Sequence, residues 1–174
     1  KTILFSLLLL IFLSWGCSSD NKITVSSPSK NIRLEINNSK KNHEPCFNLI
    51  SGSEATILSS TFHLNLKDIC LNNDLRVIGS ETESVSNTWI NKFGERSEIH
   101  DNYNQLKIFL KNKEININLI FRVYDEGAAF AYEFPRQDSR DSLTITDEKI
   151  VFSFSDDHYA WSASRAQASY SHVP

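Results

Sequence analysis

The chain has 174 residues, of which 40% are hydrophobic, and a formal net charge of -3 at pH 7. This length is sufficient for one domain with a hydrophobic core. The small net charge, with basic residues scattered along the sequence, excludes the electrostatic footprint of a nucleic-acid-binding protein. We therefore expect no nucleic acid among its partners.

Residues 1–16 have the layout of a secretory signal peptide. Lys1 supplies a positive charge, and the apolar run 3–13 is too short to span a bilayer as a permanent helix. Gly16-Cys17 is typical of a lipoprotein cleavage site, at which the cysteine is acylated. We therefore predict export to the periplasm or outer membrane of a Gram-negative bacterium, with Cys17 as a lipid anchor and residues 17–22 as a tether. The alternative is an ordinary signal peptide with an incidental cysteine.

Residues 23–174 are predicted to form one β domain, because apolar residues recur at every second position. The apolar positions of these runs are Ile32, Leu34 and Ile36; Phe62, Leu64 and Leu66; Leu106, Ile108 and Leu110; and Ile115, Ile117, Leu119, Phe121 and Val123. Polar turns are expected at 37–42, 72–74 and 125–127. The last of these predicts a hairpin leading to a strand over 128–134 that ends at Pro135.

Two further strands are expected at 143–145 and 150–154, and no segment after residue 22 has a helical pattern. Together the strands predict an all-β fold, an antiparallel β-sandwich of two packed sheets. Cys46 and Cys70 form an even pair that either makes one disulfide or serves as two buried small residues.

Several polar residues receive structural interpretations. The two glutamates within residues 95–98 lie beside basic residues, which favours a local charge network over a catalytic pair. Residues 101–104 are expected to form a turn in which Tyr103 packs. Arg122 alternates outward from the core face of its strand, and we expect it to pair with Asp125 or Glu133.

The sequence contains no phosphate-binding loop, dinucleotide-binding, zinc-protease or nucleophile-elbow motif. It does contain a series of spaced motifs in a fixed order: Trp89, Gly94-Glu95, Ile99-x-Asp101-x-Tyr103-Asn104-x-Leu106, Phe121-Arg122-x-Tyr124-Asp125-x-Gly127-x-Ala129-Phe130, Tyr132-x-Phe134-Pro135 and Asp157-His158-x-Ala160-Trp161. This series resembles the N-terminal domain of glycoside hydrolase family 97, which includes periplasmic and outer-membrane-associated α-glucosidases and α-galactosidases.

The resemblance implies an incomplete β-super-sandwich, galactose mutarotase-like in fold, that packs on a (β/α)₈ barrel. Two carboxyl groups of the barrel would carry the hydrolysis. It also implies a calcium ion, held mostly by barrel glutamates and by one sandwich carboxylate beyond Pro174. We therefore assign no catalytic residue and no metal ligand in this sequence. Because the chain starts at Lys1 and stops within a polar stretch, we expect it to be the front part of a longer protein.

Asp157, His158 and Trp161 are the candidate substrate-binding residues. They follow the last predicted strand, and a tryptophan ring offers a flat apolar face on which a pyranose packs. Interface or core packing is the competing interpretation of Trp161. The leading hypothesis is the N-terminal part of a secreted or lipid-anchored enzyme that cleaves α-glucosidic or α-galactosidic bonds in oligosaccharides. The alternative is a β-sandwich lipoprotein that binds a glycan or a partner without catalysis.

Overall fold

The computed structural model describes residues 22–38, 45–69, 71, 75–138, 140–163, 165, 167 and 169–173. In these residues every regular element is a β-strand. The first sheet, in the order β1-β2-β3-β4-β9, contains β1 (Ile23–Ser26), β2 (Ile32–Asn38), β3 (Pro45–Ser51), β4 (Glu54–Leu66) and β9 (Ile145–Val151). The second sheet, in the order β5-β6-β7-β8, contains β5 (Arg76–Ile90), β6 (Glu98–Lys111), β7 (Asn116–Val123) and β8 (Ala128–Glu133).

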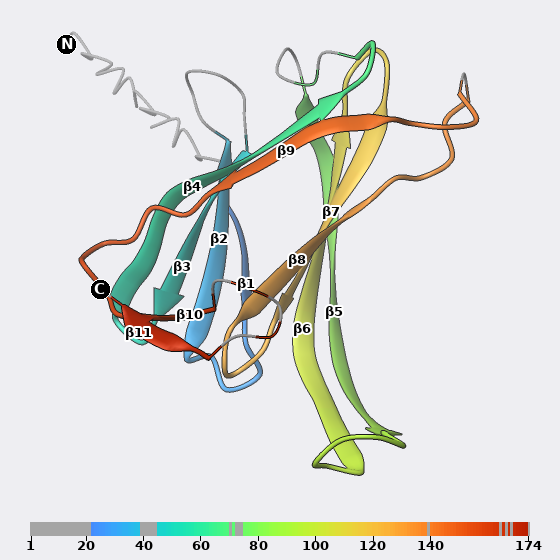
Figure 1. Cartoon of the computed structure of the whole chain (residues 1–174). Coiled ribbons are helices and arrows are strands. Elements are labelled where there is room, and N and C mark those ends of the chain that lie inside the picture. The colour runs from blue at the N-terminus through green and yellow to red at the C-terminus, as the bar shows by residue number, and fades with distance from the viewer. Residues whose placement is uncertain are drawn as a thin grey trace, which may run out of the picture.

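The two sheets pack face to face, and β5 and β6 extend together well beyond their neighbours (Figure 1). All pairings are antiparallel. A small third sheet pairs β10 (Ala160–Ser162) with β11 (Ser171–Val173). The predicted all-β class and antiparallel β-sandwich are therefore confirmed.

The core lies between the sheets and consists of the alternating residues predicted from the sequence. β2 buries Ile32, Leu34 and Ile36 against the buried positions of β6 and β7, which are Leu106, Ile108, Leu110, Leu119, Phe121 and Val123. Ile117 of β7 and Ile115, just before this strand, pack in a second cluster with Leu64 and Leu66 of β4. One face of β7 thus serves both clusters, as its long alternating run predicted.

The turn between β7 and β8 connects the two sheets at one end of the sandwich. Its backbone closes through the N–H of Tyr124, which donates to the carbonyl of Gly127 at 2.8 Å. The Asp125 carboxylate accepts the N–H of Ser29, in the β1–β2 turn of the other sheet, at 2.9 Å. The predicted hairpin is confirmed, and β8 ends at Glu133, before Pro135.

Three details differ from the sequence prediction. The strands expected at 143–145 and 150–154 are replaced by the single strand β9, which pairs with β4 from Leu66–Ile145 to Thr61–Val151. Its central residues are polar and exposed because β9 is an edge strand, so the hydrophobic pattern marked only its two ends.

The turn expected over 101–104 is wrong, because these residues continue β6 and pair with β5 from Asn104–Ser84 to Asp101–Asn87. Asn37 and Asn38 also belong to β2 rather than to a turn. The rest of the predicted turn at 37–42, and the one at 72–74, lie outside the described residues.

Candidate functional site

Three exposed aromatic residues near the C-terminal end form a stacked cluster at β10 and β11. Trp161 of β10 is paired with His172 of β11, and their rings stack with centroids 4.9 Å apart. The ring of Tyr159 lies 4.7 Å from the same imidazole. We call Tyr159, Trp161 and His172 the aromatic cluster. Trp161 is 71% exposed, so within the described structure it is not a core residue.

The other two candidate residues do not join this cluster. His158 makes an edge contact with Phe154 at 6.0 Å, and the N–H of Asp157 bonds the carboxylate of Asp156 at 2.8 Å. Sequence reasoning missed His172, which lies eleven positions beyond Trp161. Only the β10–β11 register brings them together, and a three-residue strand gives almost no pattern from which to predict it.

A second polar and aromatic group lies on the outer side of the second sheet. The Arg122 guanidinium stacks 4.6 Å from the Tyr103 ring centroid, and its Nε donates to Gln105 at 3.1 Å. Tyr124 packs on Tyr103 at 5.1 Å and donates its hydroxyl to Asp101 at 3.2 Å. The guanidinium thus has an aromatic and an amide partner, which suits a structural role.

The partner predicted for Arg122 is therefore wrong. Asp125 is bound to Ser29, and Glu133 pairs with Lys107 at 2.7 Å and accepts a bond from Asn118. The hydrogen bond from Lys107, followed by that from Asn118, lowers the pKa of Glu133. Only the Asn118–Glu133 bond joins neighbouring strands, β7 and β8, whereas the Lys107–Glu133 pair reaches from β6 across β7 to β8 and the Asp125–Ser29 bond joins the two sheets.

The charge network expected at residues 95–100 is not observed within the described part of the chain. There, neither Glu95 nor Glu98 forms an ion pair, and His100 instead shares a hydrogen bond of 3.0 Å with Thr88 across the strands. These side chains are exposed, so water competes with any attraction between them.

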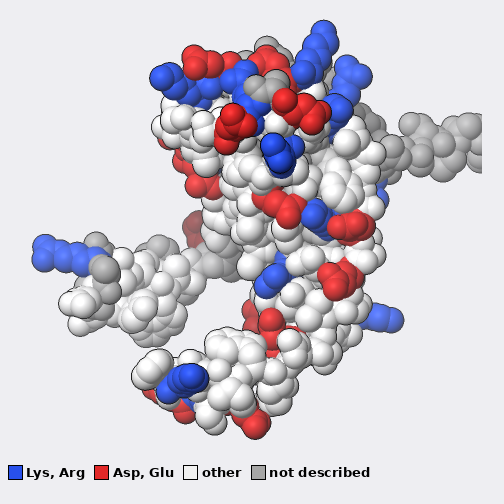
Figure 2. All heavy atoms as spheres, turned by 90° about the vertical axis from the view of Figure 1, so that its right-hand side faces the viewer, with Lys and Arg blue, Asp and Glu red and all other residues white. Residues whose placement is uncertain are grey.

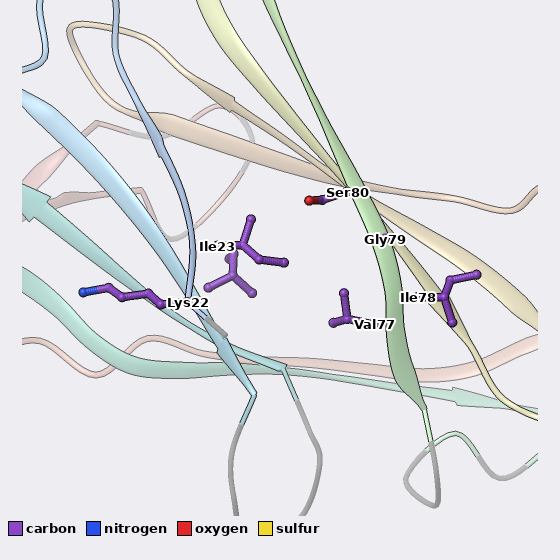
Figure 3. Close-up of a pocket in the computed structure, with 7 residues that line it drawn as sticks. Lys22, Ile23, Val77, Ile78, Gly79 and Ser80 are labelled. Carbon is purple, nitrogen blue, oxygen red and sulfur yellow. The ribbon is translucent and has the colours of Figure 1, made fainter. Parts of the chain in front are cut away.

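A groove of about 340 Å³ opens between β1 and β5, and Figure 3 shows Ile23 and Val77 facing one another across it. Lys22 points away from this gap, and its ammonium pairs with Glu35 at 2.7 Å. Burial of Glu35 opposes ionisation, but the bond and charge of Lys22 and the charge of Arg33 outweigh it and lower the pKa of Glu35. The groove therefore offers no free charged group for chemistry.

The described residues contain no group of three or more histidine, cysteine or acidic side chains placed to hold a metal ion. By themselves they do not fit a calcium site. Cys46 is a free thiol whose pKa is raised by burial, whereas Cys70 lies outside the described residues. Cys17 also lies outside them, and no helix that they form has the length and hydropathy to cross a membrane.

The fold and the aromatic cluster define an all-β domain whose exposed aromatic groups suit the recognition of another molecule. Residues 25–173 match the family model described as glycosyl-hydrolase 97 N-terminal. The chain therefore belongs to this family, as the motifs between Trp89 and Trp161 indicated.

Three solved structures have the same fold. A glycoside hydrolase family 97 enzyme from Pseudoalteromonas sp. strain K8, in complex with acarbose, matches with a TM-score of 0.75, 22% identity, and coverage of 87% of this chain and 24% of the enzyme. A family 97 variant from the same strain, in complex with panose, matches with a TM-score of 0.74 and 23% identity. The match covers 87% of this chain and 24% of the variant. A β-arabinopyranosidase matches with a TM-score of 0.71 and 21% identity, over 86% of this chain and 26% of the other. The chain thus spans about a quarter of the length of these structures.

Proposed function

We propose that this chain is the N-terminal domain of a glycoside hydrolase that cleaves α-glucosidic or α-galactosidic bonds in oligosaccharides. Membership of the glycosyl-hydrolase 97 N-terminal family supports this proposal. Two of the similar enzymes are complexes with acarbose and panose, which favours an oligosaccharide substrate. In this proposal the domain supports a catalytic (β/α)₈ barrel and completes one wall of its substrate pocket.

The observation that carries the placement of the site is the exposed aromatic cluster. The rings of Trp161 and Tyr159 both pack on the His172 imidazole, and the strand pairing of β10 with β11 holds Trp161 against it. Aromatic faces bind the apolar side of a sugar ring, and an ordered cluster loses little entropy on binding. Trp161 is therefore the proposed sugar-stacking residue, and Asp157 and His158, which precede it in the chain, are proposed to contact the same substrate.

The test uses the complete enzyme with aryl α-glucoside, aryl α-galactoside and aryl β-arabinopyranoside substrates. Trp161→Ala should raise KM and lower kcat/KM by roughly tenfold, because stacking contributes about 0.5–1.5 kcal/mol beyond burial. Tyr170→Ala, an exposed aromatic residue outside the cluster, is the matched control and should behave like the wild type. Wild-type KM and kcat/KM in Trp161→Ala would refute the placement, and a wild type inactive on every glycoside would refute the function.

We also propose that Cys17 carries a lipid that anchors the enzyme at the periplasmic side of a membrane. The Gly16-Cys17 pair after a short apolar run supports this. Radiolabelled palmitate should enter the wild type but not Cys17→Ala, and equal labelling would contradict the anchor. Calcium is the proposed cofactor of the complete enzyme, with ligands outside the described residues. Unchanged activity after chelation with EGTA would rule it out.

A second candidate function is glycan binding without catalysis, which the same exposed cluster favours. The two functions separate in one experiment with the complete protein. Binding of maltooligosaccharides without release of reducing sugar supports the binding function, whereas hydrolysis supports the enzyme.

A further inference from the structure

The ends of β5 and β6 form a two-stranded ribbon that leaves the sandwich (Figure 1). β7 pairs with β6 only from Asn104 onward, so in the described structure β5 is the one strand that pairs with residues 98–103 of β6. We call residues 86–102 the ribbon end. A two-stranded hairpin is marginally stable in water by itself, so this segment lacks the packing that stabilises the rest of the sheet.

The loop at the tip of the ribbon end nevertheless has a defined conformation. The N–H of Asn91 donates to the carbonyl of Ser97 at 2.8 Å, and the Asn91 side chain accepts the N–H of Phe93 at 3.3 Å. Gly94 has a backbone φ angle of +118°, a conformation that residues other than glycine rarely adopt. These bonds present Phe93 outward, with 85% of its surface exposed.

Apolar side chains occupy both faces of the ribbon end. Trp89 is 47% and Ile90 is 65% exposed, and successive residues of a strand point to opposite faces. Trp89 lies opposite Ile99, so that face carries two neighbouring apolar residues. An exposed apolar group of this kind marks a surface that contacts another molecule or domain, and tryptophan is a common anchor there.

The charged residues at the tip are of both signs and do not form the positive patch that binds a polyanion. Lys92 and Arg96 are offset by Glu95 and Glu98, and Figure 2 shows the ribbon end, at the bottom of the view, as largely uncharged with a few charged groups of both signs. Binding to nucleic acid or to an anionic lipid surface relies on clustered positive charge. A protein surface with an apolar groove fits these residues better.

We propose that the ribbon end inserts into a groove on the remaining part of the same polypeptide. This inference rests on the proposed function, which places the chain in a longer enzyme. In the similar family 97 structures about three quarters of the chain lies outside the matched region, whereas the ribbon end lies inside the family match. Because each face and the tip carry an exposed apolar side chain, a partner that covers all of them must enclose the ribbon end rather than lie flat against one side.

Trypsin provides the test, because Lys92 and Arg96 place two cleavage sites in the tip loop. In the complete enzyme under native conditions, mass spectrometry should show slow cleavage at both sites. Trp89→Ala and Ile90→Ala, one for each face, should each raise the cleavage rate by roughly tenfold or more. The reason is that proteolysis follows the population of the form in which the ribbon end is out of its groove. The matched control is Ile78→Ala, the same substitution on the same strand at 62% exposure, and it should leave the rate unchanged.

Three results would overturn the insertion. The first is a wild type cleaved as fast as the variants, and the second is an Ile90→Ala rate equal to that of Ile78→Ala, which would mean contact on one face only. The third is protection that appears only with added maltotriose or only in a dimer, which would assign the ribbon end to a glycan or to a second copy. Far-UV circular dichroism confirms that each variant is folded.

Hydrolysis of aryl α-glycosides by the same preparation separates the two proposals. Rapid cleavage of the tip in an active enzyme refutes the insertion and leaves the proposed function intact. Protection of the tip in a protein without glycosidase activity supports the insertion and refutes the proposed function.

Discussion

The body of the sandwich and the ribbon end contain parts of the same two strands, β5 and β6, yet they expose opposite kinds of side chain. In the body, Leu106, Ile108 and Leu110 of β6 are buried against the first sheet. In the ribbon end no second sheet covers β5 and β6, and Trp89 and Ile90 of β5 and Phe93 of the tip loop are exposed. The contrast teaches that alternation alone does not determine burial, because a face is buried only where a second layer reaches it.

The largest expected effect is in the body. Phe121 is buried in the core and contacts Phe62 and Phe130, with ring centroids 6.0 and 6.1 Å apart. Phe121→Ala should lower the free energy of unfolding by about 3–5 kcal/mol, through lost burial and the cavity that remains. Urea unfolding followed by circular dichroism measures this, and a loss below about 1 kcal/mol would contradict the core assignment.

An intermediate and pH-dependent effect is expected at Glu35, which pairs with Lys22 at 2.7 Å and Arg33 at 3.0 Å. Because its folded-state pKa is lowered from 4.5, the ionised group stabilises the fold above that pH. The contribution is lost as the pH falls from 4.5 through the lower folded-state value. The difference in unfolding free energy between wild type and Glu35→Gln should therefore shrink in acid.

Urea unfolding at a series of pH values tests this behaviour. Glu95→Gln, the same change in an exposed glutamate of the ribbon end, controls for the removal of one negative charge. A difference between wild type and Glu35→Gln that stays constant from neutral pH into acid would disprove the role of the ion pairs.

The smallest effect is expected at the tip of the ribbon end. Phe93→Ala makes the same substitution as Phe121→Ala, but in a side chain that buries little surface within the described structure. In the isolated domain, which lacks the proposed groove, the change in unfolding free energy should stay within about 0.5 kcal/mol. A loss comparable to that of Phe121→Ala would show that the ribbon end belongs to the cooperative core, and the comparison of the two regions would fail.

Much of the fold was predictable because burial leaves a period of two in the sequence. The runs in β2, β4, β6 and β7 all gave the correct buried face, and Asp125-Glu126-Gly127 gave the correct hairpin. β9 was misread as two strands because an edge strand is held by backbone bonds to β4 and needs no buried face. Backbone pairing leaves no signature in the order of side chains.

The candidate site was less predictable, because its contacts depend on register. Trp161 was singled out as a residue that packs on sugar or protein, and the structure places it in solvent beside His172. The stacking of Arg122 on Tyr103 joins adjacent strands, and neither sequence separation nor charge pointed to it. Charge complementarity suggested an acidic partner, but the nearest groups across the strand were an aromatic ring and an amide.

The pairing of β9 with β4 has a consequence for the order of events during synthesis. Asn65 and Asp147, which are bonded across these strands, are 82 positions apart, and all of β5–β8 lies between them. A chain that emerges from its N-terminus, from the ribosome or across a membrane, exposes the β4 edge before β9 arrives. Contacts over such separations also slow folding. Until then the β4 edge is a template for wrong partners, so the nascent chain is most vulnerable to misassembly just as its second sheet is being made.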